Sequence, residues 1–136
     1  MADFLEEIAS YLDTNSPDLI FDNDTGRNVF VGEYNEDIPS GVMILGQPGN
    51  TISSNRDVKE LHFPRFQLLT RDESYSTASD LMETARTILH GLIDKQTASY
   101  RVLRVHTEQE AYPMGKDGKG RYEFTCNFIA EYHPLA

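Results

Sequence analysis

Two stretches of the chain place apolar residues every three or four positions, the spacing of one face of a helix. The first covers residues 3–14, with Asp3 as the expected N-cap and Pro17 stopping the helix soon afterwards. The second covers residues 77–95 and includes Gly91, which we expect to permit close packing against a sheet. The pattern therefore predicts two amphipathic helices.

Five further stretches have the β-branched, aromatic or alternating composition of strands. They cover residues 28–34, 42–45, 59–71, 100–106 and 122–132. The run at 42–45 is apolar throughout, which favours a strand covered on both faces, by its own core on one side and with a neighbour as the candidate cover on the other. Pro64 indicates an edge or a bulge in the third strand. In the last strand apolar residues alternate with polar ones such as Glu123 and Thr125, so we expect one face on the core and the other outward.

Two segments contain turn-forming residues and no periodicity. Residues 46–57 read GQPGNTISSNRD, and an unstructured loop of this length in a small domain is often a binding element. Residues 113–120 are predicted as a glycine-rich loop between the last two strands. The order helix, three strands, helix, two strands predicts an α+β fold, a largely antiparallel sheet with both helices packed on it. The length of 136 residues predicts a single domain.

The charge balance excludes some classes of partner. The chain has 12 Lys and Arg against 22 Asp and Glu, a formal net charge of −10. This argues against a nucleic-acid binder that neutralises phosphates, and against binding to an anionic membrane surface. Cys126 is the single cysteine, so no intramolecular disulfide is expected and a reducing compartment is the default. We see neither an export signal nor an apolar run long enough to span a membrane.

A calcium loop is the first candidate for site chemistry. Asp22, Asp24 and Glu33 have the spacing of its first, third and last ligands. The fifth position is Gly26, which has no side-chain oxygen, and the sixth is Arg27, where the turn requires glycine. A solvated acidic turn is the better interpretation, and no metal is expected.

No other residue pattern favours an enzyme or a cofactor. The histidines are separated by spacings unlike that of a helical zinc site; they are His62, His90, His106 and His133. His106 lies near Glu108 and Glu110, but no nucleophile accompanies them at a recognisable spacing. Cys126, flanked by Phe124 and Phe128, is expected to be a small buried hydrophobe. Residues 115–120 lack the spacing of a phosphate-binding loop.

The order of the elements and four short segments resemble a known family. These segments are FVGEY at 30–34, FQL at 66–68, ILHGLID at 88–94 and the closing stretch at 114–128. Together they resemble the tail terminator proteins of long-tailed bacteriophages, whose relatives are often labelled minor capsid or head-tail joining proteins.

The resemblance implies a non-enzymatic assembly protein of the virion, made in the cytoplasm of the host bacterium. It implies a hexameric ring, with the free form either that ring or a monomer. The ring caps the tail tube protein, stops polymerisation and meets the neck and head-completion proteins. Genomic DNA passes through its lumen without specific binding, and the acidic balance is compatible with that. Neither a cofactor nor a membrane partner is implied.

Candidate interface residues follow from the exposed loops and strands that a ring needs. Arginine is favoured at interfaces because its planar fork pairs bidentately with carboxylates, although ordinary solvated cations explain these positions equally well. The candidates are Arg56, Arg65, Met43, Leu45, Lys116, Asp117 and Lys119. Two alternatives stay open: a neck adaptor of the head-completion or stopper type, and a small-ligand-binding or enzymatic α+β domain.

Overall fold

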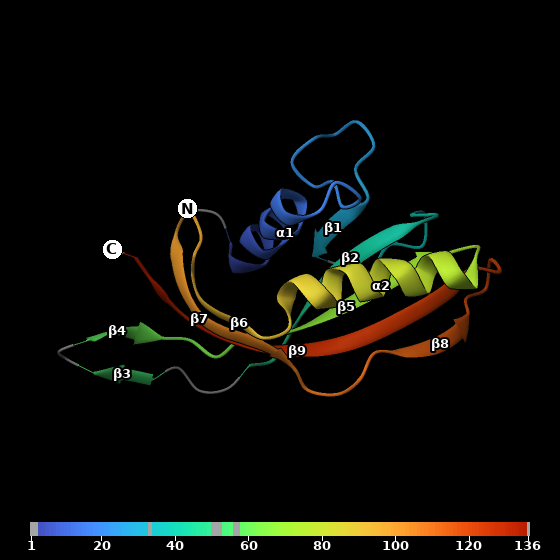
Figure 1. The fold of residues 1–136 in the computed structure, drawn as a ribbon. Helices are drawn as coiled ribbons and strands as arrows, with labels where there is room; N and C mark the ends of the chain where they lie inside the picture. Colours follow the sequence, from blue (N-terminus) through green and yellow to red (C-terminus); the bar gives the residue numbers. More distant parts are fainter. Residues whose placement is uncertain (1–2, 33, 50–52, 56–57, 136) are drawn as a thin grey trace.

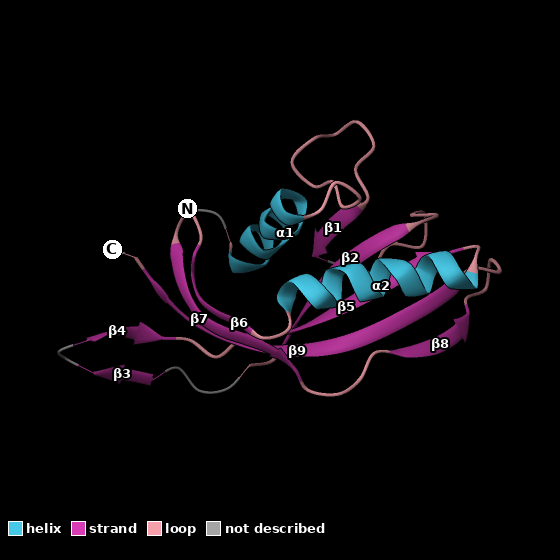
Figure 2. Ribbon diagram, viewed as in Figure 1, coloured by secondary structure: helices cyan, strands magenta, loops and turns pink. Residues whose placement is uncertain are grey.

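The computed structural model describes residues 3–32, 34–49, 53–55 and 58–135. In chain order the elements are α1 (Phe4–Asn15), β1 (Val29–Gly32), β2 (Gly41–Gln47), β3 (Ser53–Asn55), β4 (Val58–Leu61), β5 (Arg65–Asp72), α2 (Tyr75–Leu89), β6 (Leu92–Gln96), β7 (Tyr100–Thr107), β8 (Tyr112–Lys116) and β9 (Tyr122–Pro134). Both helices lie on one face of a seven-stranded sheet, and β3 and β4 form a separate two-stranded sheet (Figure 1, Figure 2). The predicted α+β fold is confirmed.

β9 organises the main sheet. The strand order is β1-β2-β5-β9-β7-β6, and β8 also pairs with β9. Over its 13 residues β9 pairs with β5 along one side and with β8 and then β7 along the other. The β1–β2 pairing is parallel and those of β9 are antiparallel, so the sheet is largely antiparallel as predicted.

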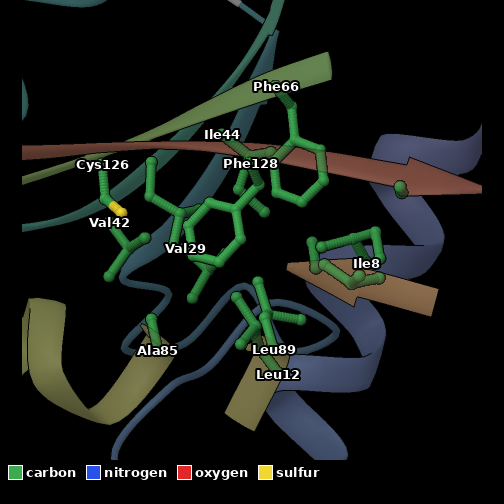
Figure 3. Close-up of a cluster of buried hydrophobic side chains, with 14 of the residues drawn as sticks. Ile8, Leu12, Val29, Val42, Ile44, Phe66, Ala85, Leu89, Cys126 and Phe128 are labelled. Carbon is green, nitrogen blue, oxygen red and sulfur yellow. The ribbon is translucent and has the colours of Figure 1, made fainter. Parts of the chain in front are cut away.

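The core fills the space between the helices and the sheet, and Figure 3 shows its centre. Ile8 and Leu12 of α1 and Leu89 of α2 lie against Phe66 and Phe128 of the sheet, all at most 2% exposed. Burial of each large apolar side chain contributes roughly 1.5 to 3 kcal/mol. The apolar stripes that predicted the helices are therefore their sheet-facing sides. Asp3 occupies the N-cap position of α1 as predicted, although its side chain makes no capping bond.

The second helix is shorter than predicted. It ends at Leu89 rather than at residue 95, and its first turn is capped by the side chain of Ser74. Gly91 has a φ of +80° in the left-handed region, where the chain turns back into β6. No neighbouring atom lies within 4 Å of a Cβ built there, so the expected role of Gly91 in close packing is wrong. Leu92 is buried in β6, and Ile93 is 69% exposed.

The predicted loops contain strands. Part of the 46–57 segment forms β3, and the strand predicted at 59–71 is two strands, β4 and β5, interrupted before Arg65. The first part of the 113–120 segment forms β8 on β9. The strand predicted at 28–34 is the shorter β1. β3 and β8 are polar or glycine-rich, so they lack the apolar alternation that indicates a strand in the sequence.

The face of β9 that was predicted to face solvent is partly buried. Phe124, Cys126 and Phe128 are buried against the helices as predicted. Glu123 and Thr125 on the opposite face are also buried, at 7% and 1% exposure, so the prediction is wrong at these positions. Tyr34 donates a hydrogen bond to Glu123 there, because the chain between β1 and β2 crosses this face.

Candidate functional site

A two-stranded arm made by β3 and β4 projects beyond the main sheet (Figure 1). The chain leaves and returns at nearly the same point, since a Cβ built on Gly49 would lie 2.6 Å from the carbonyl oxygen of Phe63. At the base, the backbone N–H of His62 donates to the Tyr132 carbonyl (2.8 Å) and the N–H of Tyr132 donates back (3.0 Å). The His62 ring stacks on Tyr132 at 4.8 Å, and Phe4 stacks on Tyr132 at 4.3 Å. The arm is thus fixed at its base.

The arm has little to hold it together alone. A two-stranded hairpin is marginally stable in water, and both strands have a free hydrogen-bonding edge among the described residues. Its sequence, SSN in β3 and VKEL in β4, is mostly polar. Contact with a neighbouring molecule would stabilise it. Arg56, a predicted interface residue, lies outside the described residues.

Arg65 is already paired within its own chain. Its Nε donates to Oε1 of Glu108 at 3.0 Å, and its Nη2 contacts the other carboxylate oxygen. These bonds hold the pKa of Arg65 above its ordinary value. The side chain of Arg104 donates a hydrogen bond from its Nε to Oε1 of Glu131 at 2.8 Å. The guanidinium of Arg65, which we expected to pair with a carboxylate on the next subunit, is therefore already bonded to Glu108 of its own chain.

Met43 and Leu45 belong to a small second core. Met43 is fully buried and packs with Ile38 and Leu69, while Leu45 and Phe30 lie partly buried against them. The prediction that both faces of this strand are covered is confirmed, and the cover on the second face comes from the same chain. Met43 therefore has no surface to offer to a partner in this structure.

A buried ion cluster fastens two loops together. Arg71, which is fully buried, donates to Glu123 at 2.7 Å and 3.0 Å and to the carbonyls of Asn35 and Ile38 at 2.8 Å and 2.9 Å. Arg121 also donates to the Ile38 carbonyl, at 2.7 Å. The chain between β1 and β2 is thereby tied to the turn between β8 and β9. Sequence reasoning missed both arginines.

The three predicted residues of that turn have different roles. The side chain of Asp117 is 8% exposed, and it accepts hydrogen bonds from the Arg121 side chain and from the backbone N–H groups of Lys119 and Arg121. These donors hold the pKa of Asp117 far below its ordinary value. The ammonium of Lys119 lies 3.7 Å from Oδ1 of Asp37, and that of Lys116 lies 5.0 Å from the centre of the Tyr122 ring. Asp117 shapes the turn, and the two lysines face solvent.

Metal-ligating side chains are scattered over the described part of the chain. Within the described ranges, no group of three His, Cys, Asp or Glu side chains converges to hold a metal ion. Cys126 is buried, and burial raises the pKa of its thiol. A cavity of about 590 Å³ lies between α1 and the β6–β7 turn. There Glu7 accepts the Ser99 N–H at 2.9 Å and anchors the turn, which is a structural role.

Comparisons with known proteins identify the family. Neither helix in the described part of the chain has the length and apolarity needed to cross a bilayer. No curated protein gives a significant match. A chain of the virion of a native gene transfer agent particle has a similar structure, with a TM-score of 0.58 and 13% sequence identity. That match covers 97% of this chain and 87% of the other, and it shows a shared fold. The family model described as bacteriophage tail terminator protein matches residues 10–134, so this chain belongs to the bacteriophage tail terminator family.

Proposed function

We propose that the protein forms a hexameric ring that caps the tail tube, stops its growth and presents the surface to which the neck of the head attaches. As a member of its family it is a structural component of the phage virion. Among its structural features, the β3–β4 arm supports the ring most directly. It projects beyond the main sheet (Figure 1), and among the described residues neither of its strands pairs with a third, so contact with a neighbouring molecule would stabilise it.

A closed ring of identical subunits needs two different surfaces on each subunit, one for each neighbour. An arm at one end of an elongated sheet provides a surface of that kind, because it projects away from the body of its own subunit (Figure 1). The partners of such a ring are the tail tube protein below and the neck proteins above. DNA passes through its lumen, and the net charge of −10 gives such a ring little attraction for phosphates.

The experiment that tests this function is electron microscopy of lysates from a phage with a nonsense mutation in this gene. Overlong tails without heads are the expected result, because a tube without its cap keeps growing. Wild-type protein supplied from a plasmid should restore tail length and head attachment.

Two other outcomes would contradict the proposal. Tails of normal length beside unattached heads would assign the protein to the neck, as a head-completion or stopper protein. Intact, infectious virions would remove it from both roles and favour a ligand-binding α+β domain.

A further inference from the structure

A groove with an acidic rim runs between α1 and β1. It has a volume of about 370 Å³, and its apolar lining comes from Phe21, Phe30 and Val31. Asp3 and Glu6 of the same lining are exposed and form no ion pair with other described residues. Its further lining residues include Arg27, which is already held by Asp24 at 2.7 Å and lies over the Phe21 ring. We call this feature the α1–β1 groove; it offers apolar contact and two carboxylates that form no ion pair with the described residues.

The outer edge of β8 has the opposite character. Tyr112 and Met114 are 48% and 52% exposed, although both are large and apolar. β8 pairs with β9 on one side, and its other side has no strand among the described residues. Lys116, at the end of the strand, forms no ion pair within the described chain and contacts only the face of Tyr122. We call this feature the β8 edge; it combines exposed apolar surface with a free positive charge.

The α1–β1 groove and the β8 edge lie toward opposite edges of the sheet. β1 is the first strand in the sheet order, whereas β8 lies on the far side of β9 (Figure 1). Surfaces placed in this way can join identical copies head to tail, and such contacts close into a ring when the rotation allows. A pairing of two β8 edges would instead stop at a dimer.

We infer that the β8 edge of one copy docks into the α1–β1 groove of the next, with Tyr112 and Met114 on the apolar lining and Lys116 facing Glu6 or Asp3. This inference rests on the proposed ring and adds one of its subunit contacts. Complementary charges at such a contact set its register and exclude wrong pairings, and apolar contact supplies the burial.

Charge reversal tests the contact in the phage with the nonsense mutation, with variants supplied from a plasmid. Lys116→Glu and Glu6→Lys should each lower the plaque titre about tenfold or more, because each places like charges opposite one another. The double variant should recover the titre, since it exchanges the two charges. Lys95→Glu, a reversal at an exposed lysine of β6, is the matched control and should leave the titre unchanged. Circular dichroism of each purified variant verifies the fold.

Cross-linking gives a second readout. Lys116→Cys combined with Glu6→Cys should yield covalent ladders with a short bis-maleimide in purified tails, while each single variant should not. Cys126 is buried and should not react. Unaffected titres for the single reversals, or the absence of ladders in tails of normal length, would overturn this contact while leaving tail termination intact. Tails of normal length in the nonsense mutant would instead overturn the proposed function itself.

Discussion

At the residue scale, the least expected feature is the buried guanidinium of Arg71. A charged side chain without water must have its charge and its N–H groups satisfied by the protein. Glu123 supplies the charge and the carbonyls of Asn35 and Ile38 accept the remaining bonds. The cluster therefore determines the path of the chain between β1 and β2.

Removal of the charge from Glu123 should destabilise the protein strongly. Glu123→Gln leaves Arg71 buried without its main counter-ion, and we expect a loss of about 3 kcal/mol in the free energy of unfolding, measured by urea denaturation. Glu83→Gln is the matched control. Its carboxylate pairs with Arg86 but is 65% exposed, so the expected loss is below about 0.5 kcal/mol. Equal losses in both variants would contradict the importance of the buried cluster.

The sequence could not reveal this cluster. Arg71 lies on β5 at the same alternating positions as Arg65 and Gln67, which remain partly exposed. What buries Arg71 is a loop more than thirty residues earlier in the chain, from Asn35 to Ile38. The alternation along a strand indicates on which face of the sheet a side chain lies. Whether that face is buried depends on which other segments pack against it.

Asp117 should make stability depend on pH. Its bond to Arg121 lowers its pKa in the folded protein from the ordinary value of 3.8, so below about pH 4 the unfolded chain binds more protons than the folded one. The stabilisation is therefore present above that pH and is lost as the pH falls further. Thermal melting of wild type and Asp117→Asn between about pH 2 and pH 7 should give a shallower acid dependence for the variant. Parallel curves would contradict this role.

At the element scale, the β3–β4 arm should be separable from the fold. Because Gly49 and Phe63 touch at its base, a short Gly-Ser linker in place of residues 50–61 should join the ends without strain. The expected result is an unchanged circular dichroism spectrum together with loss of complementation in the phage lacking this gene. A deletion of residues 47–56 is less suitable, since it removes β3 and leaves β4 unpaired. A shortened protein that still terminates tails would exclude the arm from assembly.

The elements differ in how much of their surface is buried, and therefore in how clear a hydrophobic pattern their sequences carry. α1, β7 and β9 bury a regular apolar face on the core and were predictable from their periodicity, whereas β2 was predictable from its unbroken apolar run. β8 is held by its edge hydrogen bonds to β9 rather than by burial, because it is exposed at every position. The same weak burial that hides such strands from sequence analysis leaves them free to contact another molecule.

At the scale of the whole molecule, the net charge predicts weak attraction to nucleic acid. With a net charge of −10 and Arg65 and Arg104 paired internally, the purified protein should not bind heparin in about 0.1 M salt. A basic protein of similar size on the same column is the positive control. Retention of the wild-type protein would contradict passage of DNA without specific binding.

The central position of β9 has a consequence for synthesis. β9 pairs with β5, β7 and β8, and the ribosome makes it after all of them. Until β9 emerges, the two halves of the sheet have no strand to join them, and their edges stay open. Non-local pairing of this kind is slow and exposes a nascent chain to aggregation. A subunit therefore cannot complete its sheet, or offer a finished surface to any partner, until this strand has been made.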